Sequence, residues 1–367
     1  MPKIVVVGGF LGAGKTTLIL QAALLLRHRG LNVAIVTNDQ SAELVDTFLA
    51  ADLGFTVGEV AGGCFCCRFD DLIRRFEDIE MRGSVDVVFA EPVGSCTDIV
   101  ATVIRPLNQL CKDRFVPAPF SVVVDPKRDI GEMNEMIGYL YRQQLAEADF
   151  IVVSKTDVTP DGVDIVRSRF SGVIPEQAVF GLSAVTGNGI DAWLQAVLGE
   201  QIRQPFNLPL DYKKYTDAEA ALGWLNLSAE WRTQREIRLM TIGEPLLHHM
   251  QRAIHNAGLK AAHIKITVSS QNAHRIKGSF TSNHGPVLWN PDDTNIQSSS
   301  GSLVLNARVE GSAENLSDAV KETLISMERL VGLNTTVRHL DCFSPRAPKP
   351  THRLHHGGVP VPLDKLE

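Results

Sequence analysis

The sequence lacks the features that would place a protein in a membrane or on nucleic acid. No apolar run approaches the roughly 18 residues that a transmembrane helix needs, and Met1-Pro2-Lys3 leads directly into an apolar strand, without a signal peptide. Basic residues are not in surplus, because 36 Lys and Arg face 42 Asp and Glu, giving a formal net charge of −6. We therefore expect a cytoplasmic protein with neither nucleic acid nor a membrane as its partner.

Cysteine is also scarce, with six residues in 367, but three of them are crowded together in Gly62-Gly63-Cys64-Phe65-Cys66-Cys67. A disulfide would be strained at this spacing, and a reducing cytosol keeps thiols free. Cys64, Cys66 and Cys67 can supply three thiolates to Zn²⁺, Cu⁺ or a similar ion, with a fourth ligand from Glu59 or water. A redox pair and buried apolar packing are the alternatives.

Other cysteines and histidines are scattered and favour structural or surface roles. These are Cys96, Cys111, Cys342 and His248, His249, His255, His263, His274, His284 and His339.

A glycine-rich loop follows the apolar run at residues 4–7, where a first strand would end. It fits the P-loop pattern G-x-x-x-x-G-K-[ST], in which converging backbone N–H groups hold phosphate oxygens. Lys15 would reach the outer phosphates and Thr16 would ligate Mg²⁺, and a helix expected over 15–29 would direct its positive end at the same anion. The loop predicts a nucleotide site formed by Gly9, Gly12, Ala13, Gly14, Lys15, Thr16 and Thr17.

Apolar strands and helical stretches alternate through residues 1–204. Continuous Val and Ile runs at 122–124 and 151–153 are typical of strands buried on both faces. They predict a doubly wound α/β domain with a mostly parallel sheet, whose ligands bind at the carboxyl ends of the strands. Further strands are expected at 32–37, 55–60, 85–90 and 178–182, and helices at 70–81, 98–110, 132–146, 161–170 and 189–198.

The pattern changes after residue 204. Prolines and polar residues predict a linker at 205–222. Residues 223–343 then follow a βαββαβ order, typical of a smaller ferredoxin-like α+β domain, with helices at 244–256 and 316–331 and extra hairpin strands within 271–301. The proline-rich tail at 344–367 is expected to be extended or disordered, and its histidines, His352, His355 and His356, are candidates for transient metal capture.

Two acidic residues at strand ends are candidates for the magnesium shell. Glu91 ends an apolar strand in the sequence Glu91-Pro92-Val93-Gly94, where it could order a magnesium-bound water while the Gly94 backbone contacts the γ-phosphate. Asp39 follows another strand and could contact magnesium or orient the attacking water. Lys15, Asp39 and Glu91 are therefore the candidate catalytic residues.

Two further loops favour guanine over adenine. Ser154-Lys155-Thr156-Asp157 resembles the [N/T/S]-K-x-D element of GTPases, in which the aspartate accepts hydrogen bonds from N1–H and the 2-amino group of guanine. Adenine lacks both donors, so Asp157 would select GTP. Ser183 and Ala184 begin a stretch that resembles the S-A-x loop on the other side of the base.

Together, the P-loop, the C-x-C-C run, E-x-x-G and S-K-T-D resemble the CobW family, relatives of the HypB and UreG GTPases. The resemblance implies a slow GTPase that acts as a metallochaperone or insertase, in which the nucleotide controls metal loading or release to a client. It also implies GTP/GDP, Mg²⁺ and a transition metal as ligands, with Zn²⁺ favoured over Co²⁺ or Ni²⁺, and a zinc or cobalt/corrinoid enzyme as client, bound through the C-terminal domain. The sequence leaves a homodimer open.

Some residues depart from the family pattern. Pro92 stands where serine or threonine is usual in E-[ST]-x-G, and residues 37–40 resemble HypB and UreG more closely. A long histidine tract is lacking, which argues against metal storage. Two other functions compete: an ATP-using kinase or activase with structural cysteines, and a nucleotide-gated module that binds a protein partner.

Overall fold

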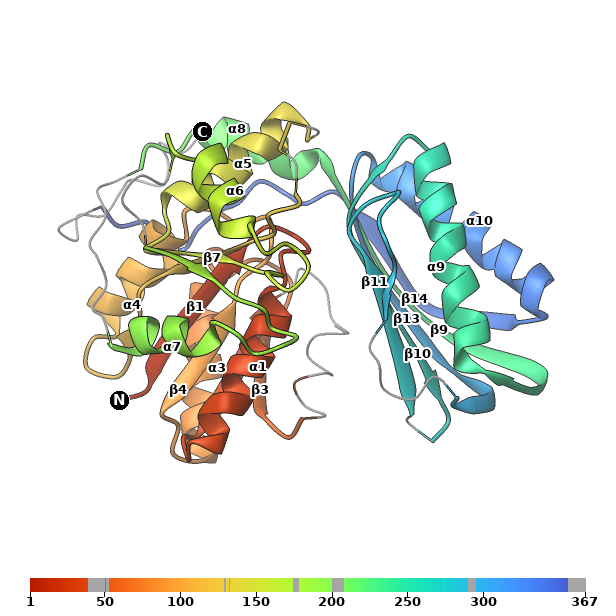
Figure 1. Ribbon diagram of the computed structural model, residues 1–367, viewed down its shortest axis with the longest axis horizontal. Helices are drawn as coiled ribbons and strands as arrows, with labels where there is room; N and C mark the ends of the chain where they lie inside the picture. Colours follow the sequence, from red (N-terminus) through yellow and green to blue (C-terminus); the bar gives the residue numbers. More distant parts are fainter. Residues whose placement is uncertain are drawn as a thin grey trace. The chain divides into compact units, whose positions relative to one another are not determined.

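The computed structural model describes residues 1–38, 50, 53–128, 130–131, 133–173, 178–199, 208–272, 274–289 and 295–355. They form two compact units; in Figure 1 the first runs from red to green and includes a blue C-terminal segment, and the second runs from green to blue. The first contains the described residues up to 218 together with 347–355, and the second contains 219–346. In this described part of the chain, no helix has both the length and the apolarity to cross a bilayer.

A parallel sheet is the centre of the first unit. Its strands lie in the order β3-β2-β4-β1-β6-β7-β8, with β5 beside β1, and each pair is parallel. The predicted doubly wound α/β fold is therefore confirmed, and the carboxyl ends of its strands meet at one edge. The strands are β1 (Lys3–Gly9), β2 (Val33–Asn38), β3 (Thr56–Val60), β4 (Val87–Glu91), β5 (Val116–Pro117), β6 (Ser121–Val124), β7 (Phe150–Val153) and β8 (Ala178–Gly181).

Helices pack on this sheet through apolar side chains. Leu18, Ala22 and Leu26 of α1 belong to the same buried cluster as Val5 and Val7 of β1, which fixes α1 directly behind the P-loop. The helices of this unit are α1 (Lys15–His28), α3 (Phe69–Arg82), the π-helix η1 (Val100–Ile104), α4 (Arg105–Leu110), α5 (Glu135–Ala146), α6 (Gly162–Arg169), α7 (Ile190–Gly199) and α8 (Tyr212–Ala220).

Helix α8 lies inside the stretch interpreted as a linker. Its residues Tyr212, Tyr215 and Ala218 are buried in a small cluster with Leu140 of α5. The weak apolar pattern of α8 explains why the sequence did not predict it, because the helix is held by a few aromatic contacts of the first unit.

The second unit is an antiparallel sheet with two helices. The strands lie in the order β12-β11-β10-β13-β9-β14, and α9 and α10 lie side by side on one face of the sheet (Figure 1). The central order β10-β13-β9-β14 is that of the predicted ferredoxin-like module, and β11 and β12 are the expected extra strands. The elements are β9 (Leu222–Arg238), α9 (Leu239–Asn256), β10 (Lys260–Ser270), β11 (Arg275–Phe280), β12 (Leu288–Trp289), β13 (Gln297–Glu310), α10 (Ala313–Val331) and β14 (Asn334–Phe343).

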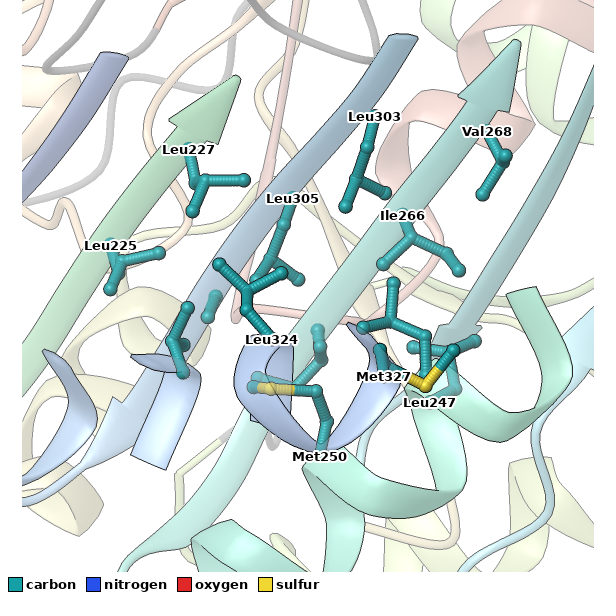
Figure 2. Packing of buried hydrophobic residues seen from close by; sticks show 14 of the residues in the cluster. Leu225, Leu227, Leu247, Met250, Ile266, Val268, Leu303, Leu305, Leu324 and Met327 are labelled. Atoms are coloured by element: carbon teal, nitrogen blue, oxygen red, sulfur yellow. The ribbon is translucent and has the colours of Figure 1, made fainter. Parts of the chain in front are cut away.

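The core of the second unit lies between the sheet and its helices. Figure 2 shows leucines of β9 and β13 and Ile266 and Val268 of β10 on the sheet face that meets Leu247 and Met250 of α9. Leu324 and Met327 of α10 belong to the same cluster. Apolar residues at every second position of β13, from Leu303 to Val309, and helical spacing on α9 and α10 bring these residues together.

Candidate nucleotide and metal site

The P-loop between β1 and α1 depends on glycine. Gly9, Gly12 and Gly14 have φ angles of 131°, 76° and 97°, in the region that L side chains rarely adopt. A Cβ at Gly9 would lie 2.4 Å from the carbonyl oxygen of Val123 in β6. The glycines thus allow a tight turn at the carboxyl edge of the sheet and leave backbone N–H groups available for phosphate oxygens.

Lys15, Thr16 and Glu91 meet beside this turn. The buried Lys15 Nζ donates to the Gly9 carbonyl at 2.9 Å and lies 3.8 Å from Glu91 Oε1. The Thr16 hydroxyl donates to the same carboxylate oxygen at 3.1 Å. These residues offer one ammonium group for phosphate and two oxygens of the type that Mg²⁺ prefers, so they fit a magnesium–nucleotide complex.

Gly94 lies against the P-loop. A Cβ at this position would be 2.8 Å from Leu11 Cδ2 and 3.0 Å from Lys15 Nζ. Gln144 of α5 holds the loop that follows β4, because its side-chain amide donates to the carbonyls of Gly94 and Cys96 at 3.0 and 2.9 Å. The E-x-x-G loop is therefore within reach of the phosphate site, whereas Asp39, the other acidic candidate, lies outside the described residues.

The predicted base-binding loops lie at the ends of β7 and β8. Ser154 Oγ donates to the Ala13 carbonyl at 2.7 Å, which joins this loop to the P-loop. Lys155, at φ 58°, extends across the P-loop, with Nζ 3.2 Å from the Gly12 carbonyl oxygen. Asp157 is exposed, as a group that receives a base from solvent must be.

The loop with Ser183 and Ala184 is fixed next to it. The Thr156 amide donates to the Leu182 carbonyl at 3.2 Å, and the buried Ser183 hydroxyl accepts from the Thr186 amide at 3.1 Å. The two predicted base-binding loops are therefore joined to each other, and the loop that begins at Ser154 also contacts the P-loop.

Asp125 and Arg128 are polar residues near this site to which the sequence gave no role. Asp125, just after β6, holds Lys155 through an ion pair of 2.6 Å, and the Arg128 guanidinium donates to the Leu11 carbonyl at 2.8 Å. The position of Asp125 at the end of a strand could have indicated its role from the sequence. No sequence feature indicates the role of Arg128, because its partner is a backbone atom more than a hundred residues earlier.

The three crowded cysteines form a compact cluster of free thiols. Cys64 Sγ lies 2.7 Å from Cys66 Sγ and 3.2 Å from Cys67 Sγ, and the last two sulfurs are 3.8 Å apart. The amides of Cys67 and Arg68 donate to the Cys64 carbonyl, so that the thiols lie on a turn that leads into α3. Neither Glu59 nor a tail histidine joins the cluster within the described residues.

Asn38 at the end of β2 fixes the cysteine turn. Its side-chain amide donates to the carbonyls of Val60 and Gly63 at 2.9 and 2.7 Å, and its oxygen accepts from the Phe65 amide at 2.9 Å. The Asn38 side chain is buried, and both of its polar atoms make hydrogen bonds that position the turn carrying the thiols.

The thiols share hydrogen bonds, which changes their acidity. The hydrogen bond to Cys64 is the main reason that the pKa of Cys67 rises to about 12, while the Lys349 amide acts in the opposite direction. Hydrogen bonds that link Cys66 with Cys64, Cys67 and Cys96, together with burial, raise the pKa of the Cys66 thiol. Cys96, which the sequence treats as isolated, thus contacts the cluster, and a metal ion must displace protons to bind.

The chain returns to the first unit after β14 and crosses the cysteine turn. We call residues 349–354 the C-terminal strap. The Lys349 amide donates to Cys67 Sγ at 3.1 Å, and the Thr351 amide donates to the Cys66 carbonyl at 2.8 Å. The His352 ring packs edge-on against Phe69, with centroids 5.2 Å apart. The predicted tail thus includes a segment that lies against the cysteine turn and contacts one of its sulfurs, whereas His356 lies outside the described residues.

Comparison with known proteins agrees with this geometry. Residues 3–180 match the family model for the CobW/HypB/UreG nucleotide-binding domain. The N-terminal domain belongs to this family. The chain is 30% identical over 171 residues to the zinc chaperone YeiR of Escherichia coli, covering 43% of this chain and 48% of YeiR. It is 26% identical over 206 residues to the zinc chaperone CobW of Pseudomonas aeruginosa, covering 47% and 54% of the two chains.

The chain therefore spans about half the length of the curated relatives it matches. Among solved structures, HypB of Helicobacter pylori in complex with nickel matches 53% of this chain and 85% of its own, at 16% identity and a TM-score of 0.41. This similarity is too loose for a comparison of individual site residues.

Proposed function

We propose that this chain is a GTPase that carries a transition-metal ion, as a metallochaperone or insertase, and that the nucleotide controls a site formed by Cys64, Cys66 and Cys67. The observation that carries the proposal is the cluster of three thiols within 4.8 Å of one another, at the strand edge that also holds the P-loop. The similarity to proteins named zinc chaperones supports Zn²⁺ as the cargo.

GTP is the proposed nucleotide because the base-binding loops offer the required partners. Asp157 would accept from N1–H and the 2-amino group of guanine, while Lys155, fixed by Asp125, would lie along the base. Ser183 and Ala184 would close the other side. Adenine offers neither donor and would leave the Asp157 carboxylate without a partner, which is costly, so this arrangement would discriminate against ATP.

Hydrolysis would depend mainly on position and charge. Lys15 would neutralise charge on the outer phosphates, and the Gly94 amide would contact the γ-phosphate. When bound, Mg²⁺ would supply further charge neutralisation, held by Thr16 directly and by Glu91 through water. Asp39 or Glu91 would orient the attacking water.

Metal transfer is the other half of the proposal. Three thiolates hold a tetrahedral ion and leave one position for water or for a ligand from the client. We propose that the second unit binds this client, a zinc enzyme or a cobalt/corrinoid enzyme. Co²⁺ and Ni²⁺ are alternative cargoes, and a homodimer is one assembly in which transfer could occur.

Metal titration tests the proposal. The metal-free protein should bind Zn²⁺ in about 1:1 ratio, with different affinities in GDP and in a non-hydrolysable GTP analogue, because a ligand shifts an equilibrium only through differential affinity. Replacing Cys64, Cys66 and Cys67 by serine should abolish this binding, whereas Cys111→Ser is the control. Equal affinity in both nucleotides would contradict the nucleotide control, and unchanged metal content in the triple variant would favour the interaction-module alternative.

A substitution at Asp157 tests the choice of base. Asp157→Ala should weaken GTP binding by at least about 100-fold, since two hydrogen bonds to a charged group are lost, and should leave ATP binding unchanged. Asp161→Ala, in the same loop region, is the control. Nucleotide affinities measured by calorimetry decide the question, and a wild-type preference for ATP would support the kinase or activase alternative.

A further inference from the structure

The C-terminal strap contacts the metal-binding cysteines through its backbone. Lys349 N–H points to Cys67 Sγ at 3.1 Å, and Thr351 uses both its amide and its hydroxyl, the latter 3.2 Å from the Cys67 carbonyl oxygen. Hydrogen bonds to ligand atoms orient them and tune how strongly they hold a metal ion. These contacts involve the Cys67 sulfur and the carbonyls of Cys66 and Cys67. The strap therefore lies where residues that hydrogen-bond to the ligands of a bound metal ion would lie.

A buried ion pair anchors the other end of the strap. Arg353 Nε lies 2.7 Å from Asp98 Oδ2, and both side chains are more than nine-tenths buried. Tyr212 donates to the same carboxylate oxygen at 2.7 Å. The backbone closes the anchor, because the Leu354 amide donates to the Ala101 carbonyl and Arg105 donates to the Leu354 carbonyl, each at 2.9 Å.

Asp98 connects this anchor to the nucleotide side of the domain. It lies four residues after Gly94, in the loop that packs against Lys15 and Leu11 and that Gln144 holds at Gly94 and Cys96. Its φ of 64° is uncommon for a residue other than glycine, and such a backbone persists only where the surroundings hold it. A change at Gly94 on nucleotide exchange would therefore reach Arg353 through a short, well-packed segment.

We propose that the C-terminal strap is part of the metal site and controls metal release. Lys349 N–H serves as a donor to the Cys67 ligand, and the Arg353–Asp98 pair holds the strap closed, so that the ion leaves when the strap lifts. The inference rests on the proposed metal-carrying function and assigns to that site a retaining element from the far end of the chain. Lys349 and Arg353 are positioning residues, which act through Cys67 and Asp98.

The sequence offers a matched pair of variants at Lys349. Lys349→Pro removes the N–H, whereas Lys349→Ala removes the side chain and keeps the N–H. Pro348 and Pro350 flank the position, so the backbone is already restricted to an extended conformation that a third proline can adopt. The two variants should therefore differ mainly in the hydrogen bond to sulfur.

The test follows Co²⁺ bound to the full chain. In Lys349→Pro we expect the thiolate-to-cobalt charge-transfer band to shift to lower energy, and extraction of Co²⁺ by a chelator to be about tenfold faster. Lys349→Ala should match the wild type. Identical bands and extraction rates in all three proteins would overturn the role of the N–H.

Arg353 tests the anchor independently. Arg353→Gln should make the extraction of Co²⁺ about tenfold faster and bring the extraction rates in GDP and in a GTP analogue closer together. Arg353→Lys should partly restore both properties. Arg346→Gln, at an exposed position, is the control. Unchanged rates and unchanged nucleotide dependence would overturn the anchor. If the cysteine variants lose Co²⁺ while the strap variants behave as wild type, the metal-carrying function stands and the strap inference fails. If the wild type binds no metal, the proposed function itself fails.

Discussion

Asn38 is the residue on which the geometry of the thiols most depends. Its three hydrogen bonds join the end of β2 to Val60, Gly63 and Phe65, residues that are 22 to 27 positions away in the sequence. The amide is buried, so removing it leaves two carbonyls and one N–H without their partner in a site of low dielectric.

We expect Asn38→Ala to lower the affinity for Zn²⁺ by about 10- to 100-fold, because the turn that presents Cys64 to Cys67 loses its support. The free energy of unfolding should fall by about 1–3 kcal/mol. Competition with a chromophoric chelator measures the first effect and denaturant unfolding the second. Asn32→Ala removes an amide with an exposed partner, Ser84, and is the control; equal zinc affinity in both variants would contradict the prediction.

The same residues show where sequence reasoning succeeds and where it stops. Lys15, Thr16 and the cysteines could be singled out because their chemistry is encoded in local spacing. Asn38 and Asp125 lie at strand ends that the sequence located, but their roles depend on backbone atoms and on a lysine brought near by the fold. Cys96 was interpreted as isolated because its contact with Cys66 crosses thirty residues.

At the scale of helices and strands, the sequence predicted which kind of element a segment forms more easily than it predicted where the element begins and ends. Apolar runs located the strands of the parallel sheet to within a few residues, except the two-residue β5, which the sequence did not predict. Helix α9 begins at Leu239, five residues before the expected start at 244, and Pro245 lies within the helix. The helix expected over 98–110 is formed by η1 followed directly by α4. Asp98 lies before both elements with a φ of 64°, which is not helical.

The carboxyl group of Glu147, the residue that follows α5, has a pKa that changes when the protein folds. Its carboxylate accepts from the Thr97 hydroxyl and the Val100 amide at 2.9 and 3.1 Å, and it is fully buried. Burial, together with the nearby Asp98, raises its pKa to about 8. The folded protein therefore binds this proton more tightly than the unfolded chain does.

Because the folded protein binds the Glu147 proton more tightly, this group contributes stability that is fully present below pH 4.5, the pKa in the unfolded chain. The contribution is lost as the pH rises to about 8, the pKa in the folded protein. Glu147→Gln removes the titration, so from pH 5 to pH 8 the variant should gain about 3 kcal/mol in unfolding free energy relative to wild type. Urea unfolding at each pH measures the difference. The exposed Glu135→Gln, at the start of the same helix, is the control, and a pH-independent difference for Glu147→Gln would contradict the assignment.

At the scale of the whole molecule, the two units have separate hydrophobic cores. The second core rests on side chains such as Leu247, which is fully buried and reaches the sheet at Gly278, where an added Cβ would lie 2.6 Å from Leu247 Cδ1 (Figure 2). A substitution there removes apolar contacts that the first unit does not share.

Leu247→Ala should destabilise the second unit by about 2–5 kcal/mol through lost burial and the cavity that remains. Hydrogen exchange followed by mass spectrometry should show faster exchange in peptides from 222–343 and no change in those from 1–199, with GTP affinity retained. Leu330→Ala, at an exposed position of α10, is the control. Equally faster exchange in both groups of peptides would show that the cores are not independent.

The position of the strap in the chain also sets an order of events during protein synthesis. Lys349 is joined to the chain 282 residues after Cys67, the sulfur that its amide contacts. On a translating ribosome, the P-loop and the thiols therefore emerge long before the segment that covers them. A nascent chain presents an open cysteine turn, and the covering contact can form only when synthesis of the second unit has finished.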